Sequence, residues 1–289
     1  MSYDLYFYKK KSNHITENEI ANYFTNNLAT VNEQGNQWFF ENDETDVYFI
    51  VEINKPEDDP EIIEMFEDFD NTNFSFNLNF MRPCFFGLEA FEFVTKMIKD
   101  LELYVLNPQV DKIEPYIPTK EELYNNWNKT NLNAALDHYN EESFYYPLEA
   151  SNEVWEFNLN REKLQEKVGE EYFVSRIFFA TTFKNMNAVT LTTWSCHIPN
   201  ILPKTDYYLL TREYKKLFKP VKDTVLISRE TFMDNFSDYF EDYTEKNCII
   251  IDKEKANKVA KIFNGLKSNL KYGEDLERIG MENLYNAKP

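Results

Sequence analysis

The sequence predicts an α+β fold, in which two domains each pack a mixed or mainly antiparallel sheet against helices. The chain has 289 residues, enough for two domains of ordinary size. Phe and Tyr supply most of the aromatic residues, which form 17% of the chain and favour strands. Strand-like and helix-like segments are interleaved, but the strands follow one another too closely for a regular βαβ repeat.

Periodicity places the elements of the first domain. Apolar side chains at every second position predict strands over residues 3–8 and 74–80. A capping box at Thr16 begins a helix that ends near residue 28. Apolar residues at helical spacing predict a second helix over 87–101. Further elements are expected as strands at 37–41, 46–53 and 104–106 and as a short helix at 57–69.

Prolines between residues 107 and 118 indicate a linker, and they set the domain boundary. The first domain should therefore span residues 1–110 and the second 111–270, followed by a polar C-terminal tail at 271–289 with one short helix. The expected helices of the second domain cover 119–138, 151–168, 229–243 and 253–267. Its expected strands cover 172–183, 187–195, 206–210, 224–228 and 248–251.

The chain is strongly acidic, with 50 Asp and Glu, 31 Lys and Arg and a net charge of −19. Residues 1–110 hold 21 of the acidic residues and only 7 of the basic ones. Such a surface repels phosphate backbones and anionic lipids, so we expect neither nucleic acid nor a membrane as a partner. It attracts a basic protein, which is the partner that we expect, although acidity also serves solubility alone.

The cysteines point to a reducing compartment. Cys84, Cys196 and Cys248 are odd in number and widely spaced, which does not suit a disulfide framework. No stretch approaches the roughly 18 apolar residues of a membrane-spanning helix. Residues 1–14 lack the apolar core of a signal peptide. We therefore expect a cytoplasmic protein.

The chain carries no motif for a metal, a nucleotide or a covalent nucleophile. Its cysteines and three histidines are too dispersed for a structural zinc site. Glycine-rich phosphate loops and the G-x-S-x-G elbow are absent, so no cofactor and no catalytic residue is expected. An enzyme remains an alternative, with a hydrolase-like site assembled from dispersed residues. Its candidate residues are Arg82, Cys84, His197 and Asp206.

Two acidic surfaces are the candidate docking sites for the basic partner. On the expected helix at 229–243, a row of carboxylates without intervening Lys or Arg lies opposite the apolar face: Asp234, Asp238, Glu241 and Asp242. The other surface follows the segment 57–70, with Glu57, Asp58, Asp59, Glu61, Glu64 and Asp68. Opposite charge speeds encounter and sets specificity. The alternative is that both surfaces are solvated faces without a partner.

Three stretches carry a family resemblance: residues 1–7 (MSYDLYF), residues 76–83 (FNLNFMRP) with Glu89 and Pro108-Gln109 downstream, and segment 193–207 with its Thr-Trp, Ile-Pro and LPKTDY. They resemble uncharacterised bacterial proteins of the kind encoded beside polymorphic or type VI secreted toxins. The resemblance implies an immunity protein that binds and blocks a toxin in the cytoplasm of the producing cell. It assigns no function to individual positions.

We therefore expect a non-catalytic binding protein that neutralises a secreted toxin by occluding it. The alternatives are the enzyme described above and an adaptor or structural protein with several partners, for which exposed aromatic patches would be typical. An affinity that falls steeply with salt would favour the acidic surfaces as the docking sites.

Overall fold

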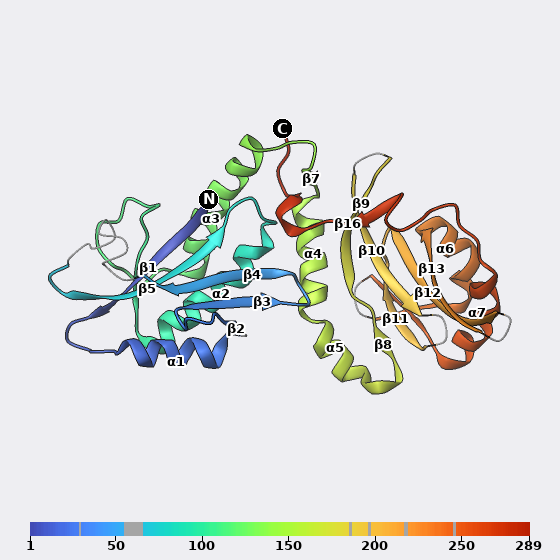
Figure 1. The fold of residues 1–289 in the computed structure, drawn as a ribbon, viewed down its shortest axis with the longest axis horizontal. Helices are drawn as coiled ribbons and strands as arrows, with labels where there is room; N and C mark the ends of the chain where they lie inside the picture. The colour runs from blue at the N-terminus through green and yellow to red at the C-terminus, as the bar shows by residue number, and fades with distance from the viewer. Residues whose placement is uncertain (29, 55–65, 185–186, 196–197, 217–218, 245–246) are drawn as a thin grey trace. The chain divides into compact units, whose positions relative to one another are not determined.

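The computed structural model describes residues 1–289 except 29, 55–65, 185–186, 196–197, 217–218 and 245–246 (Figure 1). The chain forms two compact units. Unit 1 comprises Met1–Glu141 and Tyr285–Pro289, and unit 2 comprises Glu142–Leu284. Helices and mainly antiparallel sheets occur in both units, which confirms the α+β class. The division falls after residue 141 rather than after residue 110.

Unit 1 is built on one antiparallel sheet. Its strands are β1 (Ser2–Lys10), β2 (Thr30–Val31), β3 (Gln37–Asn42), β4 (Val47–Ile53), β5 (Phe69–Asn79) and β6 (Tyr104–Leu106), in the order β2-β3-β4-β5-β1-β6. Leu5 lies opposite Phe76, which lies opposite Val51, and all three are fully buried. Because strand side chains alternate, Asn77 and its neighbours line the other face. The polar face expected for 74–80 is thus explained.

Helices α1 (Glu17–Asn27) and α2 (Phe85–Leu101) cover the buried face of this sheet. Phe24 of α1 contacts Trp38 with ring centroids 5.4 Å apart, and Phe91 of α2 contacts Tyr3 at 5.8 Å. Helix α3 (Lys120–Asp137) packs on α2, where the Trp127 ring lies 6.2 Å from Phe91. Aromatic side chains therefore supply the centre of the unit 1 core.

The expected linker belongs to unit 1. Val105 in β6 exchanges two backbone hydrogen bonds with Tyr116, at 2.8 and 3.0 Å, so residues 107–118 return to the sheet. Proline content alone therefore did not distinguish a loop inside a unit from a connection between units.

The expected tail is divided between the units. The side chain of Asn286 accepts a 2.7 Å hydrogen bond from the Cys84 backbone N–H.

Unit 2 contains a five-stranded sheet (β13-β12-β10-β9-β16) and a four-stranded sheet (β14-β15-β11-β8). The strands are β8 (Phe173–Val174), β9 (Ile177–Thr182), β10 (Asn187–Ser195), β11 (Asn200–Pro203), β12 (Tyr207–Lys216), β13 (Lys219–Ser228), β14 (Glu241–Asp242), β15 (Cys248–Ile251) and β16 (Leu276–Arg278). Strands β7 (Phe144–Tyr145) and β17 (Leu284–Tyr285) are short. β10 and β12 pair in parallel, because the chain between them passes through β11 in the other sheet.

The helices of unit 2 are α4 (Leu148–Leu159), α5 (Arg161–Val168), α6 (Arg229–Phe236) and α7 (Lys253–Gly265). Trp194 of β10 lies at the centre of the core that joins α6 and α7 to the sheet. Its ring centroid lies 5.1 to 5.7 Å from the rings of Phe232, Phe236, Phe240 and Phe263. This cluster fixes the position of α6.

Three expected elements of unit 2 were wrong in detail. The helix expected at 151–168 is broken at Asn160 into α4 and α5. The strand expected at 172–183 divides at Ser175, whose hydroxyl donates to the backbone of Thr193, so that β8 and β9 join different sheets. The helix expected in the tail is strand β16, which pairs with β9 and buries Leu276, followed by a single 3-10 turn, Met281–Asn283.

Candidate functional site

The first expected acidic surface lies mostly outside the described residues. Glu57, Asp58, Asp59, Glu61 and Glu64 fall there, so their role stays a prediction. Asp68 is described and exposed.

The helix expected to reach residue 69 does not, because β5 already begins at Phe69 and Asp68 lies in a bend before it. The carbonyl oxygen of Asp68 accepts a 3.0 Å hydrogen bond from the backbone N–H of Lys11. Asp68 therefore lies immediately before the start of the inner strand β5 and not on a helix face.

The second expected surface is also not one helix face. Helix α6 ends at Phe236 and is followed by a 3-10 turn, Ser237–Tyr239, and by β14. The turn lets Phe236 and Phe240 both contact Trp194, each at 5.1 Å. Strand β14 then pairs with β15. The four carboxylates expected on one helix are thus divided among three elements: Asp234 in α6, Asp238 in the turn, and Glu241 and Asp242 in β14.

Two of these four carboxylates have basic partners. Glu241 forms an ion pair with Lys255 of α7, and Asp242 forms one with Lys204 at 2.7 Å. The row itself contains no lysine or arginine, as its sequence indicated, but two lysines from other elements pair with it. Both lysines come from distant parts of the sequence, and they remove Glu241 and Asp242 from the unpaired negative charge of this region.

A smaller acidic surface remains on α6 and the following turn. Glu230, Asp234 and Asp238 recur at every fourth position, and all three are exposed. Met233 lies among them and is 47% exposed. Within the described part of the chain, none of the three carboxylates takes part in an ion pair. We call these four residues the α6 acidic surface. Glu230 was missed by the sequence analysis, although the i, i+4, i+8 spacing could have indicated it.

The scaffold beneath the α6 acidic surface is well fixed. The Ser228 hydroxyl caps α6 by accepting the Thr231 N–H at 3.3 Å, and the Arg229 N–H donates to the Asp206 carbonyl at 2.7 Å. On the buried side, the Phe232 ring stacks on Tyr208 with centroids 4.1 Å apart. Glu230 and Asp234 therefore extend from a helix whose start and buried face are both held by hydrogen bonds and packing, and Asp238 lies in the turn that follows it.

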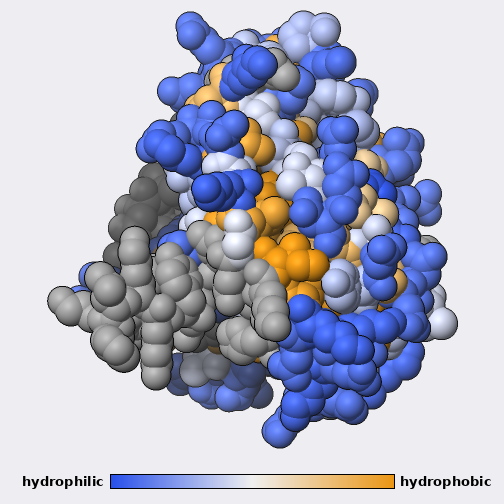
Figure 2. Space-filling model, turned by 90° about the vertical axis from the view of Figure 1, so that its right-hand side faces the viewer, coloured by the Kyte–Doolittle hydropathy of each residue, from blue (hydrophilic) through white to orange (hydrophobic). Residues whose placement is uncertain are grey.

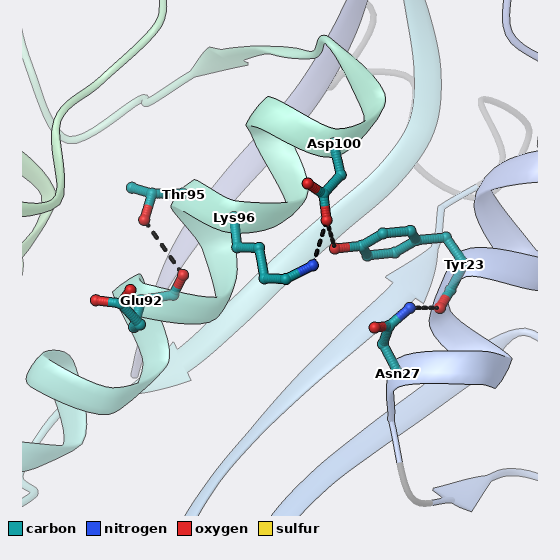
Figure 3. A network of polar contacts seen from close by, with 6 residues as sticks. All are labelled: Tyr23, Asn27, Glu92, Thr95, Lys96 and Asp100. Carbon is teal, nitrogen blue, oxygen red and sulfur yellow. Dashed lines mark hydrogen bonds and ion pairs between the residues drawn. The ribbon is translucent and has the colours of Figure 1, made fainter.

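Some exposed carboxylates elsewhere are paired with cations. Asp100 of α2 forms an ion pair with Lys96 and accepts a 3.0 Å hydrogen bond from the Tyr23 hydroxyl of α1 (Figure 3). Hydrogen bonding from Lys96 and Tyr23 lowers the pKa of Asp100. Glu92 pairs with Lys120 at 2.6 Å. In these two places a cation from the same unit neutralises the carboxylate, whereas no such pair is formed by Glu230, Asp234 or Asp238 among the described residues.

Figure 2 shows one face of the molecule, where hydrophilic residues cover most of the surface and hydrophobic residues gather in a small central area. Apolar groups surrounded by polar ones are typical of interaction surfaces. On the α6 acidic surface, the same combination occurs on the scale of single residues, with Met233 among three carboxylates.

Asp206 and Cys84, two of the candidate residues for an enzyme, have local structural surroundings. The Asp206 carboxylate of unit 2 accepts hydrogen bonds from the backbone N–H and the hydroxyl of Thr190, both at 2.8 Å. Cys84 of unit 1 is fully buried, and burial raises the pKa of its thiol to about 12, so that it is protonated near neutral pH. Arg82 also belongs to unit 1, and His197 lies outside the described residues.

No group of three or more potential metal ligands gathers among the described His, Cys, Asp and Glu residues. In the same part of the chain, no helix combines the length and apolar character needed to cross a bilayer. Comparison of the chain with protein-family models, curated proteins and solved structures found no match. Function therefore has to be inferred from the side chains themselves.

Proposed function

We propose that this chain is a non-catalytic binding protein whose α6 acidic surface docks a basic protein, and that the partner is a secreted bacterial toxin which it occludes in the cytoplasm. The observation that carries the proposal is the group of three exposed carboxylates around an exposed methionine on α6 and the turn after it, none of which forms an ion pair with a described residue. The resemblance of the sequence to toxin-associated bacterial proteins supports the choice of partner.

Charge supplies the first part of the physical argument. Carboxylates at positions i and i+4 of a helix repel each other, which costs a few tenths of a kcal/mol per pair in isolated helices. Glu230 and Asp234 have this spacing, and Asp238 continues it. A lysine or arginine from a partner relieves this repulsion. The net charge of −19 also attracts a basic partner over long range, which speeds its encounter with the chain.

Met233 supplies the second part. A methionine side chain is flexible and polarizable, and it adapts to the shape of an apolar partner surface. Desolvated apolar contacts at the centre of an interface, with charged groups at the rim, are typical of protein–protein recognition. We therefore infer that Met233 contributes mainly to the affinity for the partner, and that the three carboxylates contribute mainly to the rate of association.

The test begins with recovery of a basic partner from the cells that produce this chain, with the chain as bait at low salt. Affinity for the recovered partner is then measured with the triple variant Glu230→Lys, Asp234→Lys, Asp238→Lys. A matched control reverses three exposed carboxylates of α4, Glu149, Glu153 and Glu156, with the same change in net charge. We expect the α6 triple to lose affinity by roughly tenfold or more and the control to lose much less.

Met233→Ala provides a second readout. It should weaken binding while it leaves the dependence of affinity on salt unchanged, because no charge is removed. Equal losses in the α6 triple and the α4 control would show that net charge alone attracts the partner, and would overturn the assigned surface. The toxin assignment is tested separately: expression of the partner should arrest growth, and co-expression of the wild-type chain should restore it.

A further inference from the structure

Arg82 of unit 1 has an unusually constrained backbone. It follows Met81, which adopts a left-handed conformation with φ of 61°, although it is not a glycine. The buried side chain of Asn131 accepts from the Arg82 N–H at 3.0 Å and donates to its carbonyl at 2.9 Å. Non-glycine residues in this region of backbone space are strained, and such strain is concentrated at functional sites.

The guanidinium group of Arg82 is held as firmly as its backbone. Its Nε donates to the Tyr48 hydroxyl at 2.8 Å and its Nη1 to the Met81 carbonyl at 2.9 Å. Its central carbon lies 5.5 Å from the centre of the Tyr48 ring. Arg82 is half-buried, so this cation is positioned before any ligand arrives.

The same guanidinium has no carboxylate partner among the described residues, although the chain holds 50 acidic residues. Nη2 carries two N–H donors that the contacts above do not use. The Tyr48 hydroxyl accepts from Nε, which leaves its own hydrogen to donate. A guanidinium presents Nε and Nη2 on one edge, so the hydroxyl and Nη2 offer two donors side by side.

We propose that Arg82 and Tyr48 form a binding site for a carboxylate that is attached to an apolar group. A single guanidinium matches a monoanion, and the net charge of −19 disfavours a phosphate dianion. On the same face of the sheet, Ile50 follows Tyr48 by two positions and lies opposite Phe39, and both are half-buried. These two side chains offer an apolar contact beside Tyr48. The site does not depend on the proposed function.

Benzoate is the probe, and benzamide, its neutral counterpart, is the control. Arginine side-chain signals of the ¹⁵N-labelled chain are followed by NMR at constant ionic strength, with the Arg82 signal assigned by its loss in Arg82→Lys. We expect the Arg82 Nε signal to saturate with a midpoint at least tenfold below that of free N-acetylarginine. Acetate should bind more weakly than benzoate, and the signal of exposed Arg229 should not saturate in this range.

Two variants test the assigned groups. Tyr48→Phe keeps the ring but removes the hydroxyl, and should raise the midpoint several-fold. Glu41 of β3 is an exposed carboxylate directly opposite Tyr48. Glu41→Gln removes its negative charge and should lower the midpoint of the benzoate titration. A midpoint equal to that of N-acetylarginine, or an equal response to benzamide, would overturn the site. A response to a peptide ending in an aromatic residue, stronger than to benzoate, would identify a protein C-terminus as the source of the carboxylate.

Discussion

The side-chain amide of Asn131 hydrogen-bonds both the N–H and the carbonyl of Arg82, so that a residue of α3 fixes the loop between β5 and α2. Asn131→Ala leaves both backbone groups without this partner, in a place where Asn131 itself is 1% exposed. We expect a loss of about 2–4 kcal/mol in the free energy of unfolding, measured with urea. Asn133→Ala, an exposed position on the same helix, should change it by less than about 0.5 kcal/mol.

Gly87 and Trp127 define a second expected outcome. A Cβ added to Gly87 would lie 2.6 Å from Cε3 of Trp127 and 3.0 Å from Cδ2 of Tyr124. Gly87→Ala should therefore destabilise the chain by about 1–3 kcal/mol, because α2 and the Trp127 ring of α3 must move apart to make room for the methyl group. Gly265→Ala is the matched control, since it is also helical and meets nothing within 4 Å. It should be neutral or stabilising by up to about 1 kcal/mol. If Gly87→Ala also left the free energy of unfolding unchanged or raised it, the close packing of Gly87 against Trp127 would be contradicted.

Alkaline pH should destabilise unit 1. Burial raises the pKa of Cys84 from its ordinary value of 9.0 to about 12, and burial raises that of Tyr124 from 10.0 to about 12. Between these values the unfolded chain loses protons that the folded chain keeps, so stability present below pH 9 is lost as the pH rises toward 12. Tyr124→Phe should reduce this loss in urea titrations at pH 8 to 11. Tyr272→Phe, at an exposed tyrosine, should leave the profile as in the wild type.

The contact of Asp100 with Lys96 and Tyr23 should depend on salt and pH. Because the pKa of Asp100 is lowered in the folded state, its carboxylate stabilises the fold at pH values above its ordinary pKa of 3.8. This stabilisation is lost as the pH falls through the pKa of the folded state. The difference in unfolding free energy between wild type and Asp100→Asn should therefore shrink in 1 M NaCl and vanish in strong acid. Asp137→Asn, on the exposed side of α3, provides the comparison. A difference that persists in acid would contradict the ionic contribution.

Local signals in the sequence predicted the elements that depend on local structure. Thr16 and Glu19 form the expected capping box, and the period-two segments at β1 and β5 are strands. Strands β11, β14 and β16 were missed because each has only two to four residues. β11 and β16 are stabilised by partners far away in the sequence, which periodicity within a short window does not detect.

The candidate site was predicted only in part, for a related reason. Asp234 and Asp238 were expected and remain unpaired among the described residues, whereas Glu241 and Asp242 meet Lys255 and Lys204, which lie 14 and 38 residues away. The end of α6 at Phe236 depends on the position of Trp194 in another element. Charge patterns along a sequence show which residues are acidic. Only the tertiary structure shows which of them have been neutralised.

The hydrogen bond between the Cys84 N–H and Asn286 means that unit 1 is assembled from two segments with the whole of unit 2 between them. During synthesis at roughly 5–20 residues per second, Asn286 leaves the ribosome about 7–30 s after Glu141. For that interval, the first segment exists without the residues that complete its loop before α2. Nascent unit 1 is thus a transient, incomplete state that becomes native only after unit 2 has been translated.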